Sequence, residues 1–102
     1  MNDRAREALV AAGLKGVRQI KGALYDPRGG RCAMGVIQEA GAWDVSLRRP
    51  LDGCPECGAK HQTYHASMPI RTEEDLIIHL NNDHGWDFLT IARKVDVTDG
   101  DA

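Results

Sequence analysis

Apolar residues recur at helical spacing in several short segments, and this pattern predicts a mainly α-helical fold. In residues 3–13 the Ala and Leu side chains fall on one face, Asp3 can cap the first turn and Gly13 can end the helix. Residues 14–25 keep a helical spacing but contain two glycines, so they predict a second, short helix of weak propensity. A Pro-Arg-Gly-Gly sequence then predicts a turn before the pattern resumes.

Residues 31–41 form the next segment with an apolar helical face, made of Ala, Val and Ile side chains. Gly35 inside this helix predicts the close approach of a neighbouring segment, because glycine has no side chain to prevent it. Cys32 has no partner at ligand spacing and is expected to be a small buried thiol, with a role as fourth metal ligand as the minor alternative. In the connector that follows, we expect the Trp43 ring to pack on the core.

Two further helices are predicted in the second half of the chain. Residues 73–84 follow Thr72, whose side chain can form a capping box with Asp75 three residues later. Residues 88–95 carry an apolar stripe and follow Asp87, which can cap their first turn. The pattern therefore predicts a small fold of four to five helices.

The chain length of 102 residues suits a single domain, which we place at residues 1–96. The acidic segment 97–102 is expected to be a disordered tail. Only five residues are aromatic, so the apolar core is thin for a domain of this size. A metal ion that cross-links two segments would add to the stability of such a core.

Four residues have the spacing of a tetrahedral zinc site. Two cysteines, Cys54 and Cys57, are separated by two residues, and two histidines, His79 and His84, follow after a spacer of twenty-one residues. The histidines would lie about 140° apart on an ideal helix, so both can reach one ion only if the helix loosens before the second. The Asn, Asn and Asp residues between them are weak helix formers and predict that loosening.

The cysteine pair lies in a segment that predicts a zinc knuckle over residues 52–65, joined by a structural Zn²⁺ to the helix that follows. The Pro and Gly beside the cysteines favour a tight turn whose backbone N–H groups point at the sulfur atoms. A short two-stranded β-ribbon over residues 51–65 would be compatible with this turn. His61 and His65 lie in the same segment and are alternative ligands that could replace either histidine of the helix.

Charge is distributed unevenly along the chain, whose net charge is −2. The first half has an excess of basic residues and the second half an excess of acidic residues. For the arginines near the Gly-rich turn and in the connector, a solvated surface is the favoured interpretation, and contact with an anion or a nucleic acid is the alternative. These residues are Arg18, Arg28, Arg31, Arg48 and Arg49. The turn itself lacks the spacing of a nucleotide-binding loop.

Two blocks of sequence, Gly30 to Ala40 and His79 to Trp86 followed by Ile91-Ala92, resemble a group of small uncharacterised proteins of actinobacteriophages and actinobacteria. That group shares a GxCAxGxL-x-EA helix and a later LND-x-x-G/H-W … IA helix pair. The resemblance covers about half of the chain and implies a phage-encoded protein that acts in the host cytoplasm. It transfers no catalytic residue. Many members of the group lack the two cysteines of the knuckle, so the knuckle resembles an insertion that carries its own metal.

The sequence favours a non-enzymatic binding module in which zinc has a structural role. Two cysteines and two histidines leave no open coordination position for a substrate, and no constellation of nucleophile and base is present. Together with the resemblance, this favours a host protein as the partner. The alternative is a nucleic-acid-binding, zinc-finger-like protein, although the helix that carries the histidines is acidic and would be repelled by phosphate.

A nuclease is a third interpretation, based on His79, Asn81 and His84. It is less favoured because these residues lie on one helix rather than on a strand and loop before a helix. No small-molecule substrate is identified. The sequence has no apolar run long enough for a membrane span and no signal peptide, so we expect a cytoplasmic protein that does not contact membranes.

Overall fold

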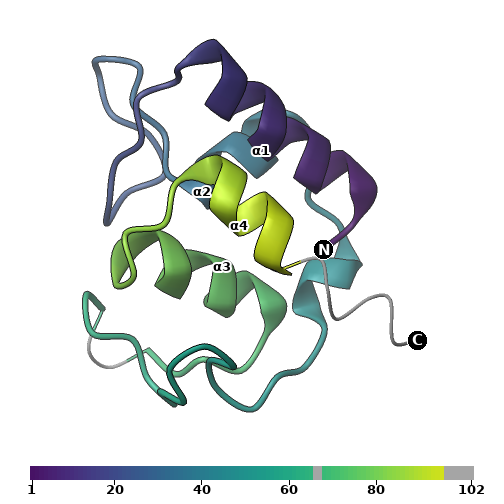
Figure 1. Cartoon of the computed structure of the whole chain (residues 1–102), viewed down its shortest axis with the longest axis vertical. Coiled ribbons are helices and arrows are strands. Elements are labelled where there is room, and N and C mark those ends of the chain that lie inside the picture. The colour runs from purple at the N-terminus through teal and green to yellow at the C-terminus, as the bar shows by residue number, and fades with distance from the viewer. Residues whose placement is uncertain (66–67, 96–102) are drawn as a thin grey trace.

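The computed structural model describes residues 1–65 and 68–95, and this part of the chain is mainly α-helical (Figure 1). It contains four α-helices and one 3₁₀ turn, and no strand forms within it. The elements in chain order are α1 (Asp3–Lys15), α2 (Ala33–Glu39), η1 (Val45–Arg48), α3 (Glu73–Asn82) and α4 (Phe88–Val95). The predicted fold class is therefore confirmed. The predicted tail at residues 97–102 lies outside the described residues.

The four helices pack around one apolar core. Helix α1 contacts α2 and α4, and α3 contacts α2, α4 and η1, so the helices close on one another in a ring. Each helix contributes a fully buried aliphatic side chain to the centre: Leu9, Ile37, Ile77 and Ile91. Burial of a side chain of this size is worth about 1.5–3 kcal/mol, so the helices are held mainly by this shared core.

Helix α1 begins at Asp3 as predicted, but its capping residue and its end differ from the prediction. Asn2, not Asp3, is the N-cap, and its side-chain oxygen accepts a hydrogen bond of 2.7 Å from the Ala5 amide. The helix continues through Gly13 and ends at Gly16, which has a φ of 73°. A left-handed conformation of this kind is favourable for glycine and stops the helix there.

The predicted short helix at residues 14–25 is wrong. Beyond Gly16 the chain forms a loop, and this loop is held by isolated bridges from Gln19 and Tyr25 to Arg31. The apolar residues of this segment keep a helical spacing, but the left-handed turn at Gly16 prevents the helical hydrogen bonds from continuing. Residues 17–31 are called the arginine loop below.

Helix α2 is shorter than the predicted helix at residues 31–41. Cys32 is its N-cap, and the sulfur accepts a hydrogen bond of 3.3 Å from the Gly35 amide. The prediction that Cys32 is a buried thiol is confirmed. The close approach predicted at Gly35 is also confirmed, because a side chain there would collide with the carbonyl oxygen of Leu24.

Helices α3 and α4 begin as predicted. The Thr72 side chain accepts a hydrogen bond from the Asp75 amide, and the Asp75 carboxylate accepts one from the Thr72 amide, which completes the capping box. Asp87 accepts a hydrogen bond of 2.8 Å from the Thr90 amide in the first turn of α4. These caps satisfy backbone N–H groups that have no partner inside their helices.

Two predictions between α2 and α3 are wrong. The Trp43 ring does not pack on the core; it is 36% exposed, its N–H donates to Glu74, and the Arg48 guanidinium lies 5.5 Å from the ring centre. The β-ribbon over residues 51–65 does not form. This segment, called the knuckle loop below, instead lies beside the residues that come just before α3. Isolated bridges join Pro50 to Thr72 and His61 to Pro69.

Candidate metal centre

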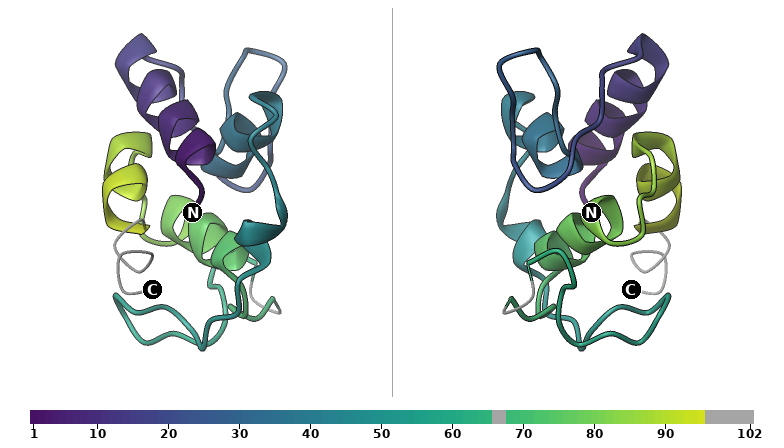
Figure 2. Two further views of the ribbon diagram at one scale, coloured as in Figure 1. Left: turned by 90° about the vertical axis from the view of Figure 1, so that its right-hand side faces the viewer. Right: turned by 90° about the vertical axis from the view of Figure 1, so that its left-hand side faces the viewer.

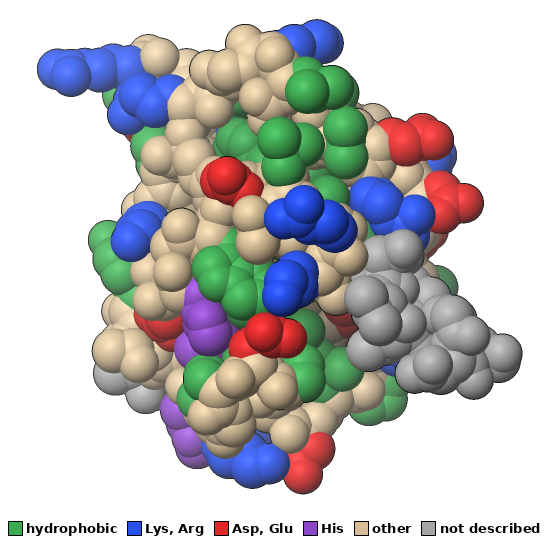
Figure 3. Space-filling model, viewed as in Figure 1, with side chains coloured by type: hydrophobic (Ala, Val, Ile, Leu, Met, Phe, Trp, Pro, Cys, Tyr) green, Lys and Arg blue, Asp and Glu red, His purple; other side chains and the backbone are tan. Residues whose placement is uncertain are grey.

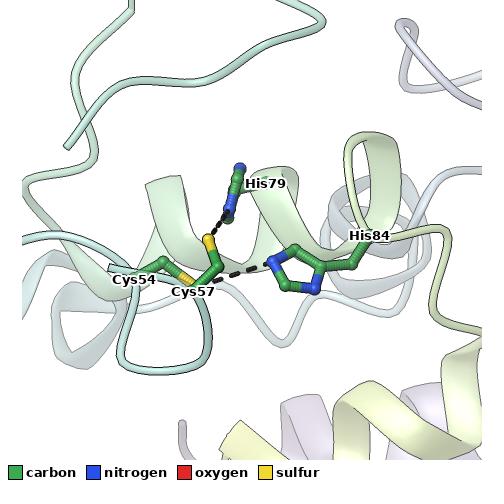
Figure 4. A group of neighbouring side chains, drawn as sticks. All are labelled: Cys54, Cys57, His79 and His84. Carbon is green, nitrogen blue, oxygen red and sulfur yellow. Dashed lines mark hydrogen bonds between the residues drawn. The ribbon is translucent and has the colours of Figure 1, made fainter. Parts of the chain in front are cut away.

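The structure brings together the four residues that the sequence pattern indicates as metal ligands. One donor atom from each of Cys54, Cys57, His79 and His84 lies within 4.8 Å of the others. Figure 4 shows the two cysteines on the knuckle loop and the two histidines at the end of α3, with their side chains turned toward one another. The alternative ligands His61 and His65 are not part of this group.

The knuckle loop turns tightly around the two sulfur atoms. The Gly58 amide donates to the Cys54 carbonyl at 2.7 Å, and Gly58 has a φ of 77°, which favours glycine. The backbone N–H groups of Glu56 and Cys57 donate to the sulfur of Cys54, and that of Ala59 donates to the sulfur of Cys57. The expectation that backbone N–H groups point at the sulfur atoms is therefore confirmed.

The end of α3 loosens where the sequence predicts it. The helix ends at Asn82, and the His84 amide reaches back to the His79 carbonyl at 3.3 Å, one residue further than in an α-helix. Gly85 then takes a φ of 68°. As a result, the two imidazole rings lie 4.8 Å apart at their centres and meet at an angle of 82°, on the same side of the helix end.

Each sulfur lies opposite one imidazole nitrogen. The Sγ of Cys57 is 3.4 Å from the Nε2 of His79, and the Sγ of Cys54 is 3.7 Å from the Nε2 of His84. Cys54 and His79 are buried, whereas Cys57 is exposed, so the group lies at the surface with one side covered by protein. The arrangement can hold one metal ion between two thiol and two imidazole donors.

Asp83 fixes the orientation of His79. The Nδ1 of His79 donates to the Asp83 carboxylate at 2.6 Å, so Nε2 is the ring nitrogen that faces Cys57 and that a metal would bind in place of a proton. The same carboxylate accepts hydrogen bonds from the backbone amides of Thr63 and Tyr64, at 2.7 and 2.6 Å. Burial acts to raise the pKa of Asp83, but these three hydrogen bonds outweigh it, and the pKa lies below its usual value.

The sequence analysis missed this role of Asp83. A carboxylate four residues after a histidine lies one helical turn away from it, and that spacing is the only local signal for the contact. The hydrogen bonds to residues 63 and 64 depend on the path of the knuckle loop, which no sequence spacing reveals.

The two thiols differ in acidity. The hydrogen bond from His79 lowers the pKa of Cys57 to about 6, with a further contribution from the Ala59 amide. Burial raises the pKa of Cys54. A thiolate is the form that binds a metal, so Cys57 is the thiol prepared for ligation at neutral pH, and a bound cation would be needed to ionise Cys54.

The five arginines considered as an anion contact do not gather at one place. Arg48 and Arg49 lie at and just after η1, away from the arginine loop that carries the other three (Figure 1). On the face drawn in Figure 3, basic side chains are scattered among apolar and acidic ones. Three arginines have acidic partners: Arg18 with Asp26, Arg31 with Glu39, and Arg49 with the buried Glu73. Arg28 is exposed at the turn.

Asn81 is a buried hydrogen-bonding centre that the sequence analysis did not identify. Its oxygen accepts hydrogen bonds from the Ala33 amide and the Gln19 side chain, at 3.0 and 2.8 Å. Its nitrogen donates to the Ile20 carbonyl and the Asn82 side chain, at 2.9 and 2.8 Å. Asn81 therefore joins α3 to the start of α2 and to the arginine loop, and its hydrogen-bonding capacity is used inside the protein.

The fold and the site together define a small helical protein with a candidate centre of two cysteines and two histidines for a metal ion. Comparison with known protein families, with curated proteins and with solved structures gives no match for this chain. Among the helices of the described residues, none is long and apolar enough to cross a membrane.

Proposed function

We propose that this protein is a zinc-stabilised binding module without enzymatic activity. The observation that carries the proposal is the spacing of the donor atoms. With zinc bond lengths of about 2.3 Å to sulfur and about 2.0–2.1 Å to nitrogen, a sulfur donor and a nitrogen donor of one tetrahedral site lie about 3.6 Å apart. The two sulfur–nitrogen distances of 3.4 and 3.7 Å lie on either side of this value. Thiolate and imidazole donors together favour Zn²⁺ over Mg²⁺ or Ca²⁺.

A zinc ion at this centre would have a structural role. Four protein donors complete a tetrahedron, so no position remains for water or a substrate. The ion would tie the knuckle loop to the end of α3, two segments that the chain separates by more than twenty residues. Because the unfolded chain has no preformed site, the free energy of zinc binding would contribute directly to folding.

We further propose that the partner is a protein of a bacterial host, and that this chain acts in the host cytoplasm as a phage product. The support for the origin is the resemblance of two sequence blocks to actinobacteriophage proteins. The support for a protein partner over a nucleic acid is electrostatic. Helix α3 begins with three acidic residues, and three of the five candidate arginines are already paired with carboxylates.

The metal part of the proposal is tested by measuring zinc in the purified protein by native mass spectrometry. We expect one zinc ion per chain in the wild type and none in Cys57→Ser. Cys32→Ser is the matched control, because Cys32 lies outside the centre and serine is a good helix N-cap. This control should retain zinc. A wild-type protein that contains no zinc and melts at the same temperature with and without a chelator would refute the proposal.

The partner is tested by affinity capture from lysate of an actinobacterial host with zinc-loaded protein as bait, and with Cys57→Ser beside it. A protein retained by the wild type and lost by the variant supports the proposal. If a zinc-loaded, folded bait retains no protein at all, the binding role is contradicted while the zinc centre is unaffected.

A further inference from the structure

The tip of the knuckle loop, residues 54–59, is a compact turn that carries both cysteines of the metal centre. Inside the tip, the Gly58 amide donates to the Cys54 carbonyl at 2.7 Å. Below it, the Gly53 amide donates to the Ile70 carbonyl at 3.1 Å, which holds the base of the loop to the segment before α3. Within the described residues, the only polar contacts from the tip to α3 and its end are those between the sulfur atoms and the imidazole rings.

A cavity of about 40 Å³ separates part of the tip from α3 and α4. Pro55 of the tip lines one side of this cavity, and Leu76, Leu80 and Trp86 line the other. Leu76 and Leu80 are buried, with exposed fractions of 5% and 1%. Atoms on opposite sides of a cavity lose their dispersion contacts, so apolar packing adds little to the hold of the tip on α3. The metal centre is therefore the main link between the tip and the helix.

The two cysteines of the tip are placed to bond with each other when no metal lies between them and α3. Both lie on one tight turn, and their sulfur atoms are close enough to interact (Figure 4). A disulfide has an S–S bond of about 2.05 Å, so the two side chains would turn toward each other to form it. Cys57 is exposed, so an oxidant from the solvent meets it first, whereas Cys54 and Cys32 are buried.

We propose that the metal centre is a redox switch, in which zinc holds the tip on α3 and a two-electron oxidant of the peroxide class releases it. The Cys57 thiolate attacks one oxygen of the peroxide, the O–O bond breaks, and a sulfenic acid forms on Cys57 as hydroxide leaves. The Cys54 thiolate then attacks that sulfur, an S–S bond forms, and a second hydroxide leaves. In sum, two thiolates, one hydrogen peroxide and two protons give one disulfide and two water molecules.

Oxidation would separate the tip from α3. A disulfide sulfur is no longer a thiolate ligand, so the zinc ion loses two of its four donors and dissociates. The tip is then held by the base of the loop alone, and the apolar side chains of Leu76 and Leu80 gain access to solvent. Reduction of the disulfide and rebinding of zinc reverse the change. This inference rests on the proposed function, because it describes how the zinc centre of the binding module is regulated.

The proposal is tested by treating the zinc-loaded full chain with hydrogen peroxide and measuring the released zinc with a chromogenic chelator. For each zinc ion released, peptide mapping by mass spectrometry should find one disulfide between Cys54 and Cys57. Dithiothreitol followed by zinc should restore the zinc content. Cys32→Ser is the matched control, because it removes the third thiol and none of the candidate ligands, and it should release zinc as the wild type does.

Separation of the tip from α3 is measured with a dye that fluoresces on exposed apolar surface. We expect the fluorescence to rise as zinc is released and to fall again after reduction and addition of zinc. The redox switch is overturned if the treated protein keeps its zinc, if zinc leaves without a disulfide between Cys54 and Cys57, or if the fluorescence does not rise. A chain that contains zinc before treatment and fails these tests still has its zinc centre. A chain without zinc at the start would refute the proposed function itself.

Discussion

The helical core and the knuckle loop lie at opposite sides of α3 and are held in different ways (Figure 2). Each of the four helices buries a large aliphatic side chain in the shared core. Between residues 51 and 65 the buried side chains are those of Cys54 and Gln62. The side-chain amide of Gln62 has no hydrogen-bond partner within the described residues. An unpaired buried amide costs free energy, so the knuckle loop gains little from burial.

The helical core and the knuckle loop therefore need different sources of stability. A core of aliphatic side chains gains free energy from the area that it removes from water. A loop with little apolar area must gain it from specific contacts, which here are backbone hydrogen bonds to residues 68–71, the hydrogen bonds to Asp83 and the proposed bonds to zinc. Regions with few buried apolar contacts are the first to open in native proteins, so the knuckle loop should depend on the metal most directly.

Removal of the metal is expected to have the largest effect. At a zinc concentration about a thousandfold above the dissociation constant, the ion contributes about 4 kcal/mol to any unfolding reaction that destroys its site. We expect a chelator to increase hydrogen exchange strongly in residues 51–65 and at the end of α3, and much less in α1 and α4. Hydrogen exchange followed by mass spectrometry measures this pattern. An equal increase in all four helices would contradict the contrast between the two regions.

A cavity in the helical core is expected to have the next largest effect and to leave the metal centre unchanged. Leu9→Ala removes a fully buried side chain and should lower the free energy of unfolding by about 2–5 kcal/mol. Urea denaturation measures the loss, and mass spectrometry should still find one zinc ion per chain. The exposed Leu14→Ala is the control and should change stability by about 0.5 kcal/mol or less. Loss of zinc from Leu9→Ala would show that the two regions are not independent.

Asn81 joins α3 to α2 and to the arginine loop, and it lies two residues after His79. Asn81→Ala leaves the Ala33 amide and the Ile20 carbonyl without their partner, which costs about 1–3 kcal/mol for each buried group. We expect lower stability in urea with zinc still bound. A variant as stable as the wild type would mean that other groups satisfy these backbone atoms.

The smallest expected effect is the pH dependence of the metal-free protein. The pKa of Cys57 is lowered to about 6, below the value of about 8.5 for an unfolded thiol. A lowered pKa contributes stability that is fully present above about pH 8.5 and is lost as the pH falls through about 6. The melting temperature should therefore rise with pH across this window more steeply in the wild type than in Cys57→Ser. Because Cys57 is exposed and screened by solvent, the difference should be modest.

The wild type must be compared with the variant because ionisation of Cys54 changes the stability with pH in the direction opposite to that of Cys57. Burial raises the pKa of Cys54, so its ionisation at high pH lowers the stability of the metal-free protein. Burial, the largest cause of the shift of Cys54, is present in both proteins, and its effect on stability therefore largely cancels in their difference. A wild type and a Cys57→Ser variant with parallel pH profiles would show that the hydrogen bond from His79 does not favour the thiolate.

The sequence by itself determined the features that depend on neighbouring residues. The spacing of two cysteines and two histidines identified the four residues that meet in the candidate centre. The capping box at Thr72 and Asp75 and the loosened turn before His84 follow from local hydrogen-bonding groups and weak helix formers. Such features are readable because the interacting atoms lie within one or two turns of chain.

Only the tertiary structure decided the features that depend on contacts across the chain. The helical spacing of residues 14–25 predicted a helix, but the left-handed Gly16 ends α1 and the chain continues as a loop in which Leu24 is exposed. The contact of Asp83 with residues 63 and 64 and the role of Asn81 join segments that are far apart in sequence. Periodicity records which residues share a face of a helix, but not which segment will cover that face, because the covering segment is chosen by packing over the whole molecule.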